Sequence, residues 1–123
     1  APAQRQRLLA HAELERYTQN TLTDHAQLEA ELERVKRDGY ALDDEEFLPG
    51  LVCIGVLVPA VDGGKSNLGL ALQAPVMRVA GDKVVQLLPA LQRAASALAA
   101  IEAESASSWQ GGAEGAESAE EDE

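Results

Sequence analysis

The sequence has 123 residues, a net charge of −11 and a single cysteine, which suits one small domain and excludes an internal disulfide framework. Residues 104–123 carry seven acids and no base, so the body that precedes them is only mildly acidic. Without clustered lysine and arginine, that body is not expected to bind nucleic acid by itself.

Hydropathy and composition give expectations about location and domain division. The longest apolar run, from Leu51 to Val61, is far shorter than the ~20 residues that cross a bilayer. No signal peptide is visible, and one cysteine suits a reducing compartment, so we expect a cytoplasmic location and no membrane partner. The start at Ala-Pro, without Met, favours a piece of a longer protein. Composition predicts a folded unit over 1–104 and a disordered acidic tail over 105–123.

The first half of the chain predicts two helices. The first spans Ala3 to about Glu15 and is followed by an extended, β-branched connector over 17–23. The second begins at a cap formed by Thr23 or Asp24 and ends at Gly39, which suits the left-handed stop position. Within it, three apolar residues recur at helical spacing and predict one apolar stripe: Leu28, Leu32 and Val35.

The second half predicts a hairpin and a long helix. Tyr40–Leu42 is a short extended segment, and Leu51–Val58 is β-branched and apolar on both faces, which predicts a central strand that is covered on both sides. A turn at 62–64 leads into a second strand, Ser66–Gln73, in an antiparallel hairpin. The expected fold class is therefore α+β, a small, mostly antiparallel sheet flanked by helices.

Pro89 interrupts the apolar pattern of the last helix. Proline lacks the backbone N–H and clashes with the carbonyl four residues earlier. We therefore expect either a kink near residues 85–89 or a regular helix that starts near Leu88.

Side chains alternate across a strand, which divides the hairpin into a bulky face and a face of small residues. If the register pairs like with like, the bulky faces pack on helices and the small faces leave a concave space. That space would be lined by Cys53, Gly55, Gly69, Ala71 and Gln73, a composition typical of a small-molecule pocket. The equally weighted alternative is that the small face lets a helix or strand pack closely.

Other candidate chemistry is weaker. A catalytic thiolate at Cys53 would need an activating base, and a lone cysteine on a buried strand is more often a small hydrophobe. The acids at 43–46 lack the spacing of a calcium loop and predict a solvated turn, although Asp43 follows the short strand and can turn inward. Gly64–Ser66 resembles the end of a phosphate-binding loop, but Pro59 stands where that loop requires glycine. One cysteine and two separated histidines do not make a usual zinc site.

The stretch GYALDDEEFLPGLVCIGVLV, residues 39–58, closely resembles the effector-binding domain of IclR-type bacterial transcription regulators. LERYTQNTLTD at 14–24 and ALQAPVMR at 71–78 are similar to that family's flanking segments. The resemblance covers about residues 8–103 and leaves the tail outside it.

This resemblance implies a GAF-like effector domain, here its second half, from a dimeric or tetrameric regulator whose separate winged helix-turn-helix binds operator DNA. It implies a small organic acid as the effector, with no other cofactor, no metal and no enzymatic activity. The family's pocket uses an aspartate at the position of Asp43, a cysteine at that of Cys53, and often serines at those of Ala71 and Gln73. The two lost hydroxyls favour an effector that is bulkier or less polar than a two- or three-carbon keto acid, aromatic acids included.

The sequence therefore predicts a sensing domain with allosteric control of DNA binding. The predicted ligand-binding residues are Asp43, Cys53, Gly55, Gly69, Ala71 and Gln73. A pure oligomerisation module and, more remotely, a thiol enzyme stay open as alternatives.

Overall fold

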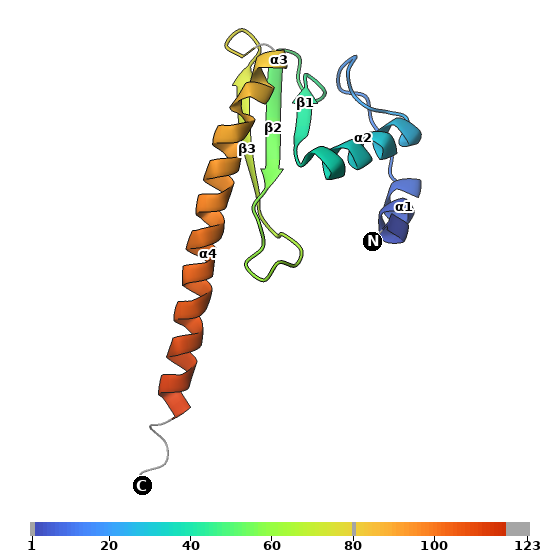
Figure 1. The fold of residues 1–123 in the computed structure, drawn as a ribbon. Helices are drawn as coiled ribbons and strands as arrows, with labels where there is room; N and C mark the ends of the chain where they lie inside the picture. The colour runs from blue at the N-terminus through green and yellow to red at the C-terminus, as the bar shows by residue number, and fades with distance from the viewer. Residues whose placement is uncertain (1, 80, 118–123) are drawn as a thin grey trace.

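A computed structural model describes residues 2–79 and 81–117. Figure 1 shows the long C-terminal helix running alongside the strands of one sheet, with the N-terminal helices beyond the opposite edge of that sheet. The elements in chain order are α1 (Pro2–Ala10), α2 (His25–Asp38), β1 (Ala41–Asp44), β2 (Leu51–Leu57), β3 (Gly69–Pro75), α3 (Gly81–Val84), the 3-10 turn Val85–Leu87 and α4 (Leu88–Glu117). The predicted α+β class is confirmed.

The three strands form one antiparallel sheet in the order β1-β2-β3, so the predicted hairpin between β2 and β3 is confirmed. The second hairpin strand begins three residues later than predicted, at Gly69 instead of Ser66, and extends to Pro75. The Ser66 hydroxyl donates to the backbone carbonyls of Val58 and Leu68, which closes the loop instead of extending the strand.

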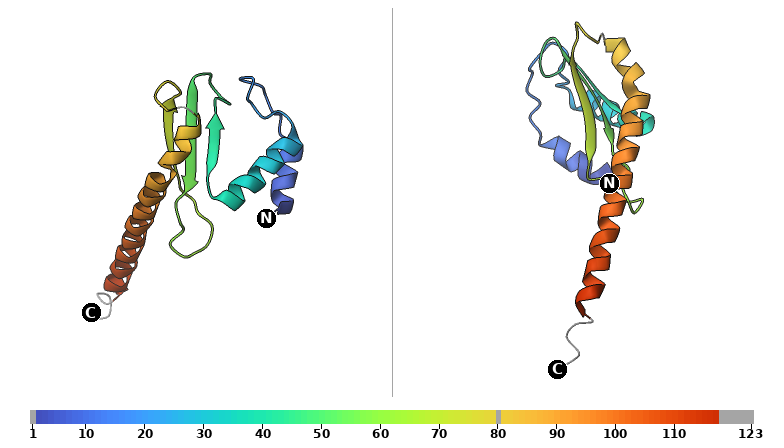
Figure 2. Two further views of the ribbon diagram at one scale, coloured as in Figure 1. Left: turned by 45° about the horizontal axis from the view of Figure 1, so that its top comes forward. Right: turned by 90° about the vertical axis from the view of Figure 1, so that its left-hand side faces the viewer.

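One face of the sheet holds the core. Val52, Ile54 and Val56 of β2 are buried, and Leu91 and Ala95 of α4 pack with them. Figure 2 shows α4 lying along this side of the sheet. β2 is central, as predicted, but the prediction that it is covered on both faces is wrong for the described residues. Its other face is only partly buried, and the Leu57 side chain there is 71% exposed.

The second helix has the predicted ends. The Asp24 carboxylate accepts a hydrogen bond of 2.9 Å from the Gln27 amide, and Gly39 takes the left-handed conformation with φ 80°. The first helix ends at Ala10 rather than near Glu15. Beyond its end, the Ala12 amide donates to the Leu9 carbonyl at 3.1 Å, and the Ala12 carbonyl lies 3.0 Å from the His25 ring nitrogen Nε2.

Of the two predictions made for Pro89, a kink or a helix that starts near Leu88, the second is confirmed. The regular helix starts at Leu88 and follows a 3-10 turn, so Pro89 occupies the first turn, where a missing N–H costs no helical hydrogen bond. α4 continues through residues 105–117, and residues 118–123 lie outside the described part of the chain. The division into a folded unit over 1–104 and a disordered tail over 105–123 stays a prediction.

Residues Asp82–Ser108 are long and apolar enough, by length and composition alone, to cross a membrane. The segment contains no long continuous apolar run, because polar residues such as Gln92, Arg93 and Ser96 interrupt it. Leu91 and Ala95 within it are buried against the sheet. Most of the segment is not buried, and Leu98 and Ile101 within it are exposed.

Candidate functional site

The open face of the sheet carries two rows of predicted site residues. In the first row Asp43, Cys53 and Gln73 lie opposite one another across the three strands. The second row consists of Ala41, Gly55 and Ala71, followed by Gly69 opposite Leu57 at the end of the hairpin. Because residues that face each other in an antiparallel pair project to the same side, the structure brings all six predicted residues onto one face.

The acidic turn fixes the Asp43 end of the first row. The carboxylate oxygen Oδ1 of Asp43 accepts a hydrogen bond of 2.7 Å from the Glu46 amide. Burial raises the pKa of the Cys53 thiol, and the negative charge of Asp43 raises this pKa further. A thiol held in its protonated form is a poor nucleophile. Cys53 is therefore suited to line a site rather than to react in it.

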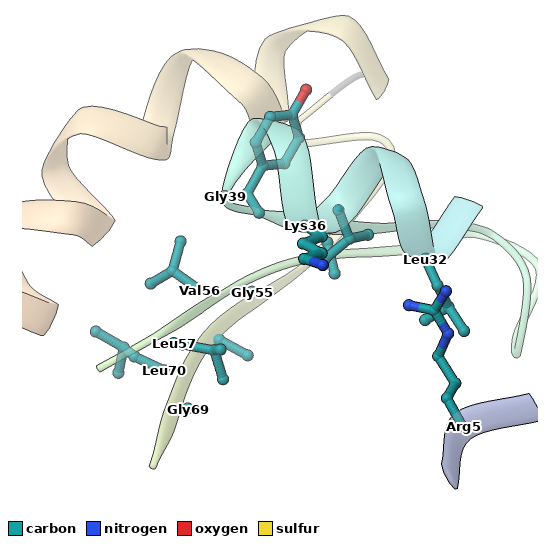
Figure 3. Close-up of a pocket in the computed structure, with 13 residues that line it drawn as sticks. Arg5, Leu32, Lys36, Gly39, Gly55, Val56, Leu57, Gly69 and Leu70 are labelled. Carbon is teal, nitrogen blue, oxygen red and sulfur yellow. The ribbon is translucent and has the colours of Figure 1, made fainter. Parts of the chain in front are cut away.

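A cavity of about 850 Å³ opens between α2 and the sheet (Figure 3). Three predicted residues, Gly55, Gly69 and Ala71, line it. The other three, Asp43, Cys53 and Gln73, lie one row further along the same face and do not line the cavity. The cavity and the polar row are thus neighbours on one surface rather than one enclosed pocket.

The sequence reasoning missed the helical wall of the cavity, which consists of Leu32, Val35 and Lys36 of α2, together with Tyr40. The available signal was the apolar stripe of α2, from which no pocket wall was predicted. In the structure this stripe is half-buried, and α2 has no fully buried residue. Leu32 and Val35 of the stripe line the cavity, whereas Leu28 does not.

Two cations line the cavity, and they differ in their surroundings. The Arg5 guanidinium forms ion pairs with Glu29 and Glu33 of α2, which also join α1 to α2. Lys36 extends its ammonium group from α2 near the apolar wall. An apolar wall with a cation beside it suits a ligand that has a hydrocarbon body and a carboxylate.

The remaining acids of the turn serve local structure. The Glu45 carboxylate accepts a hydrogen bond of 2.7 Å from the Gly50 amide, and burial followed by the charge of Asp43 raises the pKa of Glu46. Within the described residues, no group of three or more His, Cys, Asp and Glu side chains is placed to hold a metal ion.

Comparisons with known proteins agree on one family. The family described as bacterial transcriptional regulator IclR C-terminal matches residues 1–100. The HTH-type transcriptional regulator BhcR of Paracoccus denitrificans is 36% identical over 98 residues, which are 79% of this chain and 34% of that protein.

Two of the solved structures with the same fold have a sequence identity to this chain above 25%. The C-terminal domain of the E. coli regulator KdgR is 28% identical with a TM-score of 0.72, over 84% of this chain and 62% of that one. The PobR inducer-binding domain from Acinetobacter was solved as a double mutant with 3-hydroxybenzoic acid. It is 29% identical with a TM-score of 0.72, over 80% of this chain and 57% of that one.

The chain spans about a third of the length of the curated relatives it matches. Those relatives are transcriptional regulators, not enzymes. With a family match over residues 1–100 and the same fold in solved effector domains, the chain belongs to the family of C-terminal domains of IclR-type bacterial transcriptional regulators.

Proposed function

We propose that this chain forms part of a domain that senses a small organic acid and thereby controls DNA binding by the protein that contains it. The observation that carries the proposal is the row of Asp43, Cys53 and Gln73 on the face that α4 leaves open, beside a cavity of about 850 Å³. A related domain, that of PobR, was solved with 3-hydroxybenzoic acid, which supports the same class of ligand here.

The proposed binding residues divide by chemistry. Gly55, Gly69 and Ala71 leave room for the ligand body, because none projects beyond a methyl group. The Gln73 amide can donate to a ligand oxygen, whereas ionised Asp43 can only accept from a ligand hydroxyl or a water. Ala71 and Gln73 stand where the family often has serines, which favours an effector bulkier or less polar than a small keto acid.

The proposed mechanism is allosteric. The protein would act as a homodimer or homotetramer in the cytoplasm, with operator DNA bound by a winged helix-turn-helix outside this chain. The effector can shift the assembly between two arrangements only by the difference in its affinity for them.

A second candidate is an oligomerisation module that binds no small molecule. Its support is the exposed apolar surface of the same face, above all the Leu57 side chain, which is 71% exposed. The thiol-enzyme alternative is disfavoured, since burial and Asp43 raise the pKa of Cys53 instead of lowering it.

A thermal-shift screen of small organic acids on the full-length protein tests the two candidates, with 3-hydroxybenzoic acid in the panel. We expect a concentration-dependent rise in Tm, because binding to the folded state stabilises it. Cys53→Leu and Asp43→Ala should abolish the rise, whereas Val61→Ala, an exposed substitution in the β2–β3 loop, should keep it. No rise for any acid with a well-folded protein would favour the oligomerisation module, and an unchanged rise in both site variants would refute the site.

A further inference from the structure

The connector between α1 and α2 is fastened to the acidic turn after β1. The Thr18 hydroxyl donates to the Glu45 carbonyl at 2.6 Å, and the Thr21 hydroxyl donates to the Glu46 carbonyl. The Asn20 amide group donates to the Asp44 carbonyl at 2.9 Å. These bonds join residues more than twenty positions apart. We name Thr18, Asn20 and Thr21 the connector clamp.

An aromatic contact also joins the connector to the turn. The rings of Tyr17 and Phe47 lie with their centroids 5.4 Å apart in a tilted arrangement. Aromatic pairs in this geometry contribute beyond the area that they bury. The connector and the turn therefore share both polar and apolar contacts.

The clamped turn has a backbone conformation that needs outside support. Glu45 has φ 56°, in the left-handed region that side chains other than glycine rarely adopt. Such a conformation persists when neighbouring contacts determine it. Here the Glu45 amide donates to the Leu51 carbonyl at 3.1 Å, and the clamp holds the carbonyls of Glu45 and Glu46.

The acidic turn also fixes the side chain of Asp43. The Glu46 amide that donates to Asp43 Oδ1 shares its peptide group with the Glu45 carbonyl, which accepts from the Thr18 hydroxyl. Movement of this peptide would release the carboxylate that lies opposite Cys53 in the sheet. A chain of direct contacts thus runs from the clamp through the turn to the polar row of the open face.

We propose that Thr18, Asn20 and Thr21 are positioning residues of the effector site: they hold the acidic turn so that the Asp43 carboxylate stays aimed along the open face beside Cys53. Their effect on effector affinity rests on the proposed function, but their effect on Asp43 does not. The clamp residues touch neither the cavity nor the row itself, so they act through the turn.

The first test needs no ligand and uses the full-length protein with Thr18→Val and Thr21→Val combined. We expect hydrogen exchange at the Glu46 amide to accelerate by roughly tenfold, since the hydrogen bonds that fix its peptide are lost. Alkylation of Cys53 by iodoacetamide, followed against pH by mass spectrometry of its peptide, should report a pKa closer to that of an ordinary thiol, because the Asp43 charge moves away.

Controls separate positioning from general damage. Thr23→Val removes a hydroxyl in the same connector that accepts from Arg16 at 2.9 Å and does not touch the turn, so both readouts should stay unchanged. Hydrogen exchange at the backbone amides that pair β2 with β3 should also stay unchanged. If the double variant fails to fold, Asn20→Ala and Thr18→Ser take its place, with a change expected for the first and none for the second. Wild-type exchange and thiol pKa in the folded double variant, or in Asn20→Ala where that variant takes its place, would overturn the proposal.

A second arm tests the effect on binding with 3-hydroxybenzoic acid as the probe. If the wild-type protein binds it, the clamp variants should bind it at least roughly tenfold more weakly, about 1.4 kcal/mol. Full affinity in clamp variants, with binding lost in Asp43→Ala, would overturn the role of the clamp in the site. Absence of binding to the wild-type protein would count against this probe and the proposed function, while the exchange and thiol measurements still decide the position of Asp43.

Discussion

The two faces of the same three strands differ in almost every property. On the closed face, Val52, Ile54 and Val56 are buried beneath α4. On the open face, Cys53 and Gly55 are only partly buried, and Ala71 and Gln73 are exposed. Adjacent residues of β2 therefore have unlike surroundings although they are neighbours in the chain.

This difference shows how a short strand can separate stability from recognition. Successive side chains point to opposite faces, so β2 contributes its bulky residues to the core and its small ones to the open surface. Burial of the bulky side chains stabilises the fold, while the small residues leave space and approachable backbone. We therefore expect substitutions on the closed face to change the free energy of unfolding, and substitutions on the open face to change binding.

The largest expected effect lies on the closed face. Ile54 is fully buried, with 0% of its surface exposed. Ile54→Ala removes buried methyl groups and leaves a cavity, which should lower the free energy of unfolding by about 2–5 kcal/mol. Urea denaturation followed by circular dichroism measures this loss.

Leu57→Ala is the matched control, because it shortens an aliphatic side chain of the same strand on the open face. Its side chain is 71% exposed, so the free energy of unfolding should change by less than about 0.5 kcal/mol. Equal losses for the two variants would contradict the division into a closed and an open face. They would also show that the open face is covered in the full-length protein.

Gly55→Val tests the open face, because it should weaken binding without lowering the free energy of unfolding. A Cβ at Gly55 would lie 3.8 Å from the Leu70 carbonyl oxygen and 3.9 Å from the Ala71 Cβ, which is ordinary contact. Gly55→Val should therefore leave the free energy of unfolding unchanged or raise it by up to about 1 kcal/mol, since glycine weakens a strand. Its isopropyl group fills the cavity wall, so an acid that binds the wild-type protein should lose at least roughly tenfold in affinity by calorimetry.

Gly63→Ala is the control for Gly55→Val, because it should lower the free energy of unfolding without changing affinity. Gly63 lies in the β2–β3 loop with φ 71°, and no atom lies within 4 Å of an added Cβ. Alanine there should lower the free energy of unfolding by about 1 kcal/mol through backbone strain alone, with affinity unchanged. If Gly55→Val kept full affinity, the cavity would not be the place where the ligand body lies.

Much of this division was readable from the sequence because it depends on a local period. The alternation of Ile54 with Cys53 and Gly55, and of Leu72 with Ala71 and Gln73, indicates two unlike faces before any register is known. The register then pairs like with like, Ile54 with Leu72 and Cys53 with Gln73. The ends of α2 were equally predictable, since its caps need only the residues beside them.

Features that depend on distant contacts could not be predicted in this way. No periodicity in residues 17–21 points to the turn at 44–47, although Thr18 and Asn20 bond its carbonyls. The distance between α2 and the sheet, which makes the cavity, depends on tertiary packing that a hydrophobic stripe does not specify. The apolar residues of β2 predicted a strand covered on both faces, but only one face is covered. Apolar character alone does not identify the element that packs on a strand.

The smallest expected effect concerns the end of the open face, where Glu46 follows Asp43 in the acidic turn. Burial, and then the charge of Asp43, raises the pKa of Glu46 above its ordinary value. A raised pKa means that the folded state binds the proton more tightly than the unfolded state does. Its stabilising contribution is therefore complete below the unfolded pKa and is lost as pH rises through the folded pKa.

Glu46→Gln removes this charge and should make the protein more stable than the wild type at pH 7. The difference should shrink when urea denaturation is repeated below the ordinary glutamate pKa, because the wild-type side chain is then neutral as well. Glu13→Gln, at an exposed acid outside this turn, is the control for a general loss of negative charge. A gain that is equal in both variants, or independent of pH, would show that net charge and not the burial of Glu46 beside Asp43 sets the effect. A gain confined to Glu46→Gln would place the electrostatic cost at the end of the open face that the connector clamp holds.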